Sequence, residues 1–214
     1  MQIDYSIIAI DLPSHNKSDE FPNLSLDLYV DIVKKLIDSL EIKDLILAGH
    51  SLGGAIIQDY YFKYPNDVSA LILCATGGRL RVSPLIFSSL KNNFQEFLKN
   101  LKIGAFSKHT KEEIKNTLIE ETAQINPSVI YMDFQICDNF DTLEKTGSIA
   151  VPCLIICGEE DRLTPIKYSK FFHDKIINSK LSIIKKAGHI VMLEKPREVN
   201  EAIKDFINNY KKQT

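Results

Sequence analysis

The sequence has no surplus of charge of one sign and no long hydrophobic run. Its 26 basic and 28 acidic residues leave a net charge of −2 and a pI near 6.2. Because no basic face stands out, nothing in the composition favours nucleic acid as a partner. No apolar run approaches the ~18 residues that a helix needs to cross a bilayer, so we expect no membrane span. The hydrophobic content of 44% is ordinary for a globular protein.

Cysteine and glycine are also scarce. The four cysteines show no spacing typical of metal ligands, and Cys74, Cys153 and Cys157 lie in predicted core strands, where a free thiol packs like a small apolar side chain. We therefore expect no metal, no disulfide bond and a reducing, cytoplasmic location. The pair Gly77-Gly78 lacks the following Lys and Ser or Thr of a phosphate-binding loop, so no nucleotide cofactor is indicated.

The most informative segment that is present reads Gly-His-Ser-Leu-Gly-Gly over residues 49–54. It follows the apolar run Leu45–Ala48, which predicts a buried strand, and precedes residues 55–62, whose apolar positions suit a helix. Gly-x-Ser-x-Gly between a strand and a helix is the pattern of a nucleophile elbow, in which a sharp turn exposes the serine hydroxyl. Small residues at Gly49 and Gly53 would let the strand and helix backbones pass closely. Taken alone, the motif also suits an ordinary tight turn.

Two later segments supply partners for this serine. The strand predicted over 151–157 leads into a polar turn that contains Asp161, and the strand predicted over 180–185 leads into His189. Ser51, Asp161 and His189 thus each follow the carboxyl end of a strand, where open α/β sheets place their chemistry. An acidic residue there is more often a helix cap or a solvated charge, and a lone histidine is more often structural. The three together, in this order, predict a catalytic triad.

These residue types divide the work of nucleophilic catalysis. His189 would take the proton of Ser51 and return it to the leaving group, while Asp161 would fix the tautomer of the imidazole. The backbone N–H of Leu52, at the start of the predicted helix, would stabilise the oxyanion. The expected partner is a small, ester-like molecule, and no cofactor is implied.

Strands and helices are predicted to alternate along most of the chain. Strands are expected over 5–11, 44–48, 68–75, 151–157 and 180–185, and helices over 25–40, 52–63 and beyond Pro196. This alternation predicts an α/β fold with a mostly parallel sheet and helices on both faces. Between the third and fourth of these strands the sequence instead predicts helices near 84–100, 110–124 and 127–137. We therefore expect a core made of 1–76 and 149–214, with a helical cap, 77–148, inserted into it.

The expected cap is rich in aromatic side chains. It holds six of the eleven phenylalanines, at positions 87, 94, 97, 106, 134 and 140. These rings suit an apolar lid over an acyl pocket, or the core of a small helical layer. Arg79 and Arg81, at the start of the cap, would be able to bind a substrate carboxylate, although surface arginines are commoner.

With these motifs the sequence resembles the α/β-hydrolase superfamily, in its branch of capped esterases and carbon–carbon bond hydrolases. Four segments carry the resemblance across nearly the whole chain: 7–13, 49–54, 158–165 and 187–196. The order Ser, Asp, His is that of the superfamily. One departure is that Ser14 and Asn16 replace glycines that are usual in the loop after residues 7–13, which alters the loop but removes no catalytic group.

The resemblance also implies that the chain begins late. Residues 5–11 match the fourth strand of the family, so that roughly 40 residues would precede them: three strands, a helix and the loop that gives the second oxyanion N–H. We expect either that the 5–11 strand pairs with 44–48 or that this edge stays open to other chains. Met1 is expected to be an internal methionine of a longer reading frame.

The sequence therefore favours a serine hydrolase that cleaves small carboxylic esters through an acyl-enzyme intermediate. Carbon–carbon bond hydrolysis and acyl transfer use the same triad, and the residues do not separate them from ester cleavage. A different class stays open as well: a weakly active or non-catalytic remnant of the fold, or a small-molecule-binding protein. Oligomeric state is not indicated.

Overall fold

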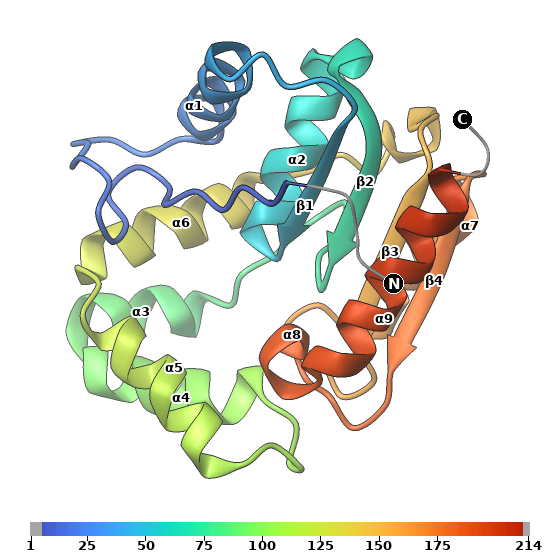
Figure 1. Cartoon of the computed structure of the whole chain (residues 1–214). Coiled ribbons are helices and arrows are strands. Elements are labelled where there is room, and N and C mark those ends of the chain that lie inside the picture. Colours follow the sequence, from blue (N-terminus) through green and yellow to red (C-terminus); the bar gives the residue numbers. More distant parts are fainter. Residues whose placement is uncertain (1–5, 212–214) are drawn as a thin grey trace.

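The computed structural model describes residues 6–211 and is built around a parallel sheet (Figure 1). Its strands are β1 Leu45–His50, β2 Val68–Cys74, β3 Cys153–Gly158 and β4 Ser179–Ile184. They lie in the order β1-β2-β3-β4, and each neighbouring pair is parallel. All four carboxyl ends therefore lie at the same edge of the sheet. The predicted α/β fold is confirmed.

Helices cover both faces of this sheet. The core helices are α1 Leu26–Ser39, α2 Leu52–Lys63, α7 Ile166–Lys175, α8 Val191–Glu194 and α9 Pro196–Lys211. Because successive strand residues point to opposite faces, Leu71 and Ile155 pack in one cluster with α1, α2 and α7. Their neighbours Ile72 and Ile156 pack in a second cluster with α9. The near-continuous apolar strands are explained by this burial on both sides.

The prediction of a strand over residues 5–11 is wrong. Residues 6–12 have no strand or bridge assignment, and Tyr5 lies outside the described residues. Ile7 and Ile8 are 92% and 53% exposed. A strand needs a partner for its ladder hydrogen bonds, and no described strand pairs with this segment. Of the two arrangements expected at this edge, the open one is found, because β1 is an edge strand of the described sheet.

Four α-helices lie between β2 and β3: α3 Pro84–Asn92, α4 Phe94–Ala105, α5 Glu112–Ala123 and α6 Pro127–Asn139. The single helix expected over 84–100 is two helices. Asn93 separates them, with φ −155° and ψ 80°, and its side-chain oxygen accepts the N–H of Glu96 to cap α4. Figure 1 shows α3, α4 and α5 beyond the carboxyl ends of the strands. The division into a core and a separate cap of residues 77–148 stays a prediction.

The aromatic rings of these helices pack mainly against one another. The ring of Phe97, 3% exposed, lies 5.8 Å from that of Phe94 and 5.9 Å from that of Phe134. Arg79 and Arg81 also contact a residue of the same segment, 77–148. Arg79 Nε donates to Asp141 at 2.6 Å, and an Arg81 nitrogen lies 4.0 Å from the same carboxylate. These contacts agree with the alternatives to substrate binding: the rings as the core of a small helical layer, and the arginines as surface residues.

The cysteines are all buried and free. Burial raises the pKa of the Cys74 and Cys137 thiols to about 12, so neither is a reactive thiolate at neutral pH. Among residues 6–211, no helix combines the length and the apolar character needed to span a bilayer.

One ionisable pair joins the loop after residues 6–12 to α6. His15 Nε2 lies 2.9 Å from Asp133 Oδ2, and the other carboxylate oxygen accepts the hydroxyl of Tyr29 at 2.6 Å. The hydrogen bond that His15 donates to Asp133 raises the pKa of His15 above its usual value, against the opposing effect of burial. The protonated form of His15 is thus stabilised by folding.

We expect His15→Gln to destabilise the protein more at low pH than at high pH. A pKa raised in the folded state contributes stability that is complete below the unfolded value near 6.5 and is lost as pH rises through the folded value. Thermal melts at pH 6 and pH 9 measure this effect. The difference in free energy of unfolding between wild type and variant should be larger at pH 6, by up to about 1 kcal/mol. A difference that grows with pH would contradict the assigned pair.

Candidate active site

Ser51 occupies a strained turn between β1 and α2. Its backbone has φ 51° and ψ −115°, a conformation that costs a residue with a side chain on the order of 1–3 kcal/mol. The turn is held on both sides: Ser51 N–H donates to Cys74 O at 3.0 Å, and Ser51 O accepts Gly54 N–H and the Thr76 hydroxyl, each at 2.9 Å. The elbow expected from the motif is therefore present as a backbone feature.

Close approach of β1 and α2 depends on only one of the two glycines expected to allow it. A Cβ at Gly49 would lie 2.2 Å from the carbonyl oxygen of Gly53, so no larger residue fits there. The expectation for Gly53 is wrong, since a Cβ at that position would meet nothing within 4 Å. Gly54 is the second tight position, because its Cβ would lie 2.4 Å from Thr76 Oγ1.

Asp161 and His189 meet at the carboxyl ends of β3 and β4. His189 Nδ1 lies 2.9 Å from Asp161 Oδ2, and both side chains are buried. The other oxygen, Oδ1, accepts the N–H groups of Leu163 and Thr164, each at 2.9 Å. The Thr164 hydroxyl donates to Oδ2 at 2.7 Å. The carboxylate is thus fixed in one orientation, with one edge turned toward the imidazole.

The surroundings of Asp161 favour its ionised form. Burial opposes ionisation, but hydrogen bonding and charge from His189, together with the two bonds from Thr164, outweigh it and lower the pKa of Asp161. A carboxylate that accepts a hydrogen bond from Nδ1 keeps the imidazole hydrogen on Nδ1. Nε2 is then the basic atom of the ring. Nε2 is the atom that a serine nucleophile needs.

The third predicted contact is not made in this structure. No hydrogen bond between Ser51 Oγ and His189 Nε2 is found among residues 6–211. Such bonds are often long in the absence of substrate and tighten when it binds. His50 links the two residues instead. It directly precedes Ser51 in the chain, and its ring centroid lies 4.7 Å from that of His189.

His50 is a residue to which the sequence motif assigned no role. Its Nε2 lies 2.9 Å from the carbonyl oxygen of His189, so Nε2 carries a hydrogen and the ring supports the loop of His189. Burial, followed by the charge of His189, lowers the pKa of His50 to about 3. His50 therefore stays neutral across the physiological range. Its position directly before the motif serine was the available signal.

The backbone N–H of Leu52 stays the predicted oxyanion donor. Leu52 is the first residue of α2, so its N–H has no partner within the helix. Further along the first turn, the N–H groups of Gly54 and Ala55 donate to Ser51 O.

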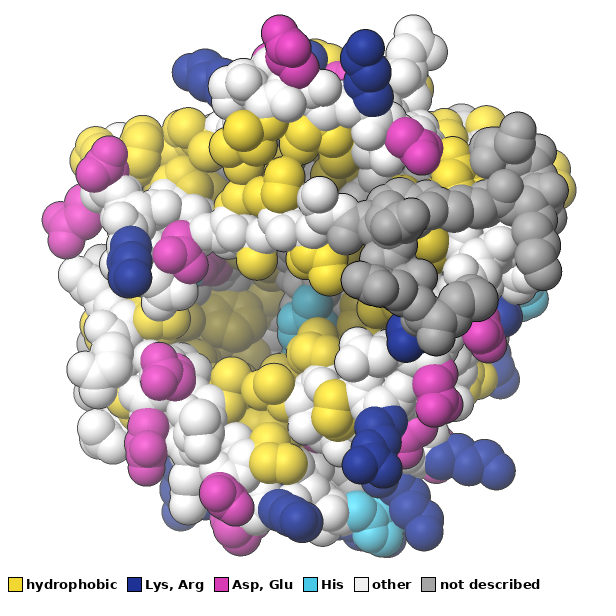
Figure 2. Space-filling view, in the orientation of Figure 1, with side chains coloured by type: hydrophobic (Ala, Val, Ile, Leu, Met, Phe, Trp, Pro, Cys, Tyr) yellow, Lys and Arg dark blue, Asp and Glu magenta, His cyan; other side chains and the backbone are white. Residues whose placement is uncertain are grey.

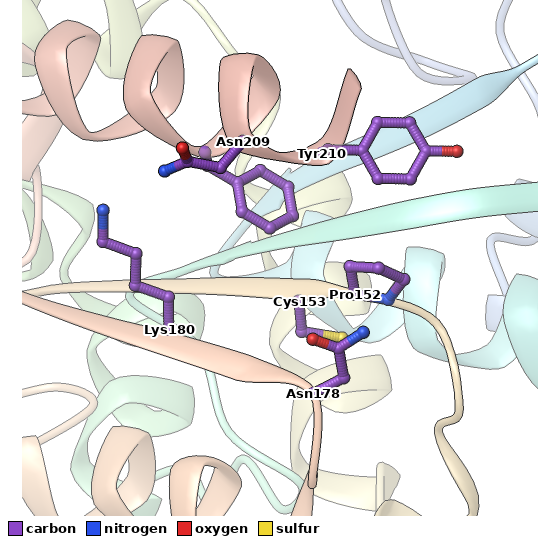
Figure 3. A pocket seen from close by; sticks show the side chains of 7 residues that line it. Pro152, Cys153, Asn178, Lys180, Asn209 and Tyr210 are labelled. Atoms are coloured by element: carbon purple, nitrogen blue, oxygen red, sulfur yellow. The ribbon is translucent and has the colours of Figure 1, made fainter. Parts of the chain in front are cut away.

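The face that carries this site is hollowed. Figure 2 shows a depression lined largely by hydrophobic side chains, with a histidine at its floor. In the same orientation, Figure 1 shows the carboxyl ends of β1 and β2 on one side and α3 on the other. A separate cavity of about 140 Å³ lies at the opposite edge, next to the amino ends of β3 and β4 and the end of α9 (Figure 3). That cavity is distant from the predicted triad. The described residues contain no cluster of three ligating side chains arranged for a metal.

The parallel sheet and the serine elbow at its carboxyl edge define an α/β hydrolase. The model of the family described as serine aminopeptidase, S33 matches residues 2–196 of the chain. The chain belongs to this family of α/β hydrolases.

Relatives of known structure or sequence agree. A thermophilic esterase is 39% identical, with a TM-score of 0.86 and coverage of 94% of this chain and 79% of the esterase. The uncharacterized hydrolase YugF of Bacillus subtilis is 29% identical over 95% of this chain and 80% of its own length. The 2-hydroxy-6-oxononadienedioate/2-hydroxy-6-oxononatrienedioate hydrolase of Escherichia coli is 26% identical over 97% and 78%. At the level of class, the protein is a hydrolase.

Proposed function

We propose that this protein is a serine esterase that cleaves small carboxylic esters with Ser51, His189 and Asp161. The observation that carries the proposal is the buried Asp161–His189 hydrogen bond at the sheet edge where the strained Ser51 turn lies. A structural role alone would not require a serine in a backbone conformation that favours glycine.

The first half of the reaction forms the acyl-enzyme. His189 Nε2 takes the proton of Ser51 Oγ as the oxygen attacks the ester carbonyl carbon, and the carbonyl oxygen becomes an oxyanion. The N–H of Leu52 donates to that oxyanion. When the intermediate collapses, the C–O bond to the alcohol breaks and the alcohol leaves with the proton held by His189.

The second half releases the acid. Water gives a proton to His189 Nε2 and its oxygen attacks the acyl carbon, and the bond to Ser51 Oγ then breaks as the proton returns to the serine. Throughout, Asp161 stabilises the charged imidazole, and its bonds from Leu163 and Thr164 keep it from rotating away.

The charged residues that flank the cap helices favour an uncharged acyl group. Arg79 and Arg81, the cations expected to bind a substrate carboxylate, both lie at Asp141. Carbon–carbon bond hydrolysis stays the second candidate, because the Escherichia coli relative is named as a hydrolase of dicarboxylates. Turnover of a dicarboxylate of that kind in preference to neutral short-chain esters would reverse this order.

Intact-mass analysis after exposure to a fluorophosphonate tests the proposal. We expect one adduct per wild-type chain and none on Ser51→Ala, because only an activated serine attacks the phosphorus. The wild-type chain should also hydrolyse p-nitrophenyl acetate. A folded chain that forms no adduct and turns over no ester would instead favour the non-catalytic, ligand-binding alternative.

A further inference from the structure

The turn between α4 and α5 lies against the loop that carries His189. We call residues 106–111 the cap turn. His189 N–H donates to the carbonyl oxygen of Ala105, directly before this turn, at 2.7 Å. A Cβ at Gly188 would lie 2.6 Å from the backbone nitrogen of Ser107. The backbones of the cap turn and the histidine loop are therefore in contact, with no space for a side chain between them.

One carboxylate joins these two backbones. Glu194, the last residue of α8, is half-buried, and its Oε1 accepts the N–H of Gly188 at 2.8 Å. Its Oε2 accepts the N–H of Ser107 at 2.9 Å and also the hydroxyl of Thr110. Hydrogen bonds to an ionised acceptor are stronger than those between neutral groups. Glu194 thus ties the residue before His189 to both ends of the cap turn.

A second carboxylate links the cap turn to the loop of Asp161. Glu160 Oε2 accepts the hydroxyl of Ser107 at 2.8 Å, and Glu160 Oε1 lies 3.4 Å from His109 Nε2. Ser107 is 1% exposed. The cap turn is therefore held at Ser107 by both acidic residues, one beside each predicted partner of Ser51.

We propose that Glu194 is a positioning residue, which fixes the imidazole of His189 relative to Ser51 by clamping the histidine loop to the cap turn. This inference rests on the proposed serine-esterase function. Among residues 6–211, the hydrogen bonds of the Glu194 carboxylate go to Gly188, Ser107 and Thr110, so we assign it no part in proton transfer. Its effect is on geometry: a displacement of about 1 Å at a reacting group can lower a rate by 10²-fold.

Glu194→Gln is the sharpest change. Glutamine has one oxygen and one NH₂ group where glutamate has two oxygens, so either Gly188 N–H or Ser107 N–H loses its acceptor and faces another donor. We expect kcat for ester hydrolysis to fall by about 10- to 100-fold, with KM changed by less than about threefold. Glu194→Asp should recover part of kcat, because it restores both acceptors on a shorter side chain.

The matched control is Glu198→Gln, the same substitution four residues further along, where the side chain is exposed. We expect it to leave kcat unchanged. Thr110→Val removes one donor to Glu194 while keeping both backbone contacts, and should give a smaller loss of kcat in the same direction. If Glu194→Gln fails to fold, the Thr110→Val result decides the proposal.

Amide hydrogen exchange measured by mass spectrometry gives a readout that does not depend on turnover. Exchange at Gly188 and Ser107 should be faster in Glu194→Gln than in wild type and unchanged in Glu198→Gln. Wild-type exchange, or a kcat within twofold of wild type, would overturn the positioning role. A wild-type chain that forms no fluorophosphonate adduct would overturn the proposed function instead, and exchange alone would then decide whether Glu194 clamps the two loops.

Discussion

Ser51→Ala is expected to lower kcat/KM for ester hydrolysis by about 10⁴- to 10⁶-fold, the loss typical of removing a serine nucleophile. The melting temperature should stay within about 3 °C of wild type. The Ser51 hydroxyl makes no hydrogen bond among the described residues, whereas its backbone N–H and carbonyl make the contacts that hold the turn. Steady-state kinetics with p-nitrophenyl acetate and a thermal melt measure the two quantities.

A glycine at the same position separates strain from chemistry. Alanine keeps the Cβ and therefore the cost of φ 51°, but glycine adopts this conformation without that cost. We expect Ser51→Gly to be as inactive as Ser51→Ala and more stable than it, on the order of 1 kcal/mol. Substantial activity in either variant would remove Ser51 from the proposed role. Equal stability of the two would argue against strain at the elbow.

Asp161→Asn is expected to reduce kcat by about 10⁴-fold with little change in fold. The N–H groups of Leu163 and Thr164 point at Oδ1, so the amide oxygen of asparagine takes that place and its NH₂ group takes the place of Oδ2. The NH₂ group then donates to His189 Nδ1, which moves the imidazole hydrogen to Nε2. An Nε2 that carries a hydrogen cannot accept the proton of Ser51.

Thr164→Val is the matched control for this argument. It removes the hydroxyl that donates to Asp161 Oδ2 but leaves the carboxylate and the backbone N–H of residue 164 in place. We expect its kcat to fall by about tenfold or less, the effect of one lost hydrogen bond. An Asp161→Asn kcat within tenfold of wild type would show that Asp161 does not set the tautomer of His189.

Local patterns predicted much of the molecule, because most elements depend on residues close in sequence. Apolar periodicity was enough to predict a helix over 25–40, where α1 lies, and the helix expected near 127–137 is α6. Both strands beginning at Leu45 and Cys153 start with apolar runs; β3 is buried on both faces of the sheet, whereas β1 is fully buried on one face only. Residues 6–12 have the same apolar character and form no strand, because strand formation requires a partner that no local pattern reveals.

In the candidate site, too, some residues could be predicted from local patterns and others could not. Ser51, Asp161 and His189 were predicted from the sequence, since each follows a predicted strand and parallel strands end at a common edge. The residues that contact and orient these three could not be predicted from local patterns. Thr164 and His50 show their roles only through contacts at 2.7 Å with Asp161 and 2.9 Å with His189. Glu194 holds Ser107 across 87 positions of the chain.

The sequence by itself determined the parallel α/β architecture, the insertion of helices between β2 and β3, and the order of the three candidate catalytic residues. These follow from hydrophobic periodicity and from the glycine spacing around Ser51, which are properties of short segments. Only the tertiary structure decided that β1 is an edge strand, that Arg79 and Arg81 lie at Asp141, and that the cap turn is clamped to the loop of His189. Each of these depends on hydrogen bonds or charges between segments far apart in the chain, and those contacts form only when the whole chain has packed.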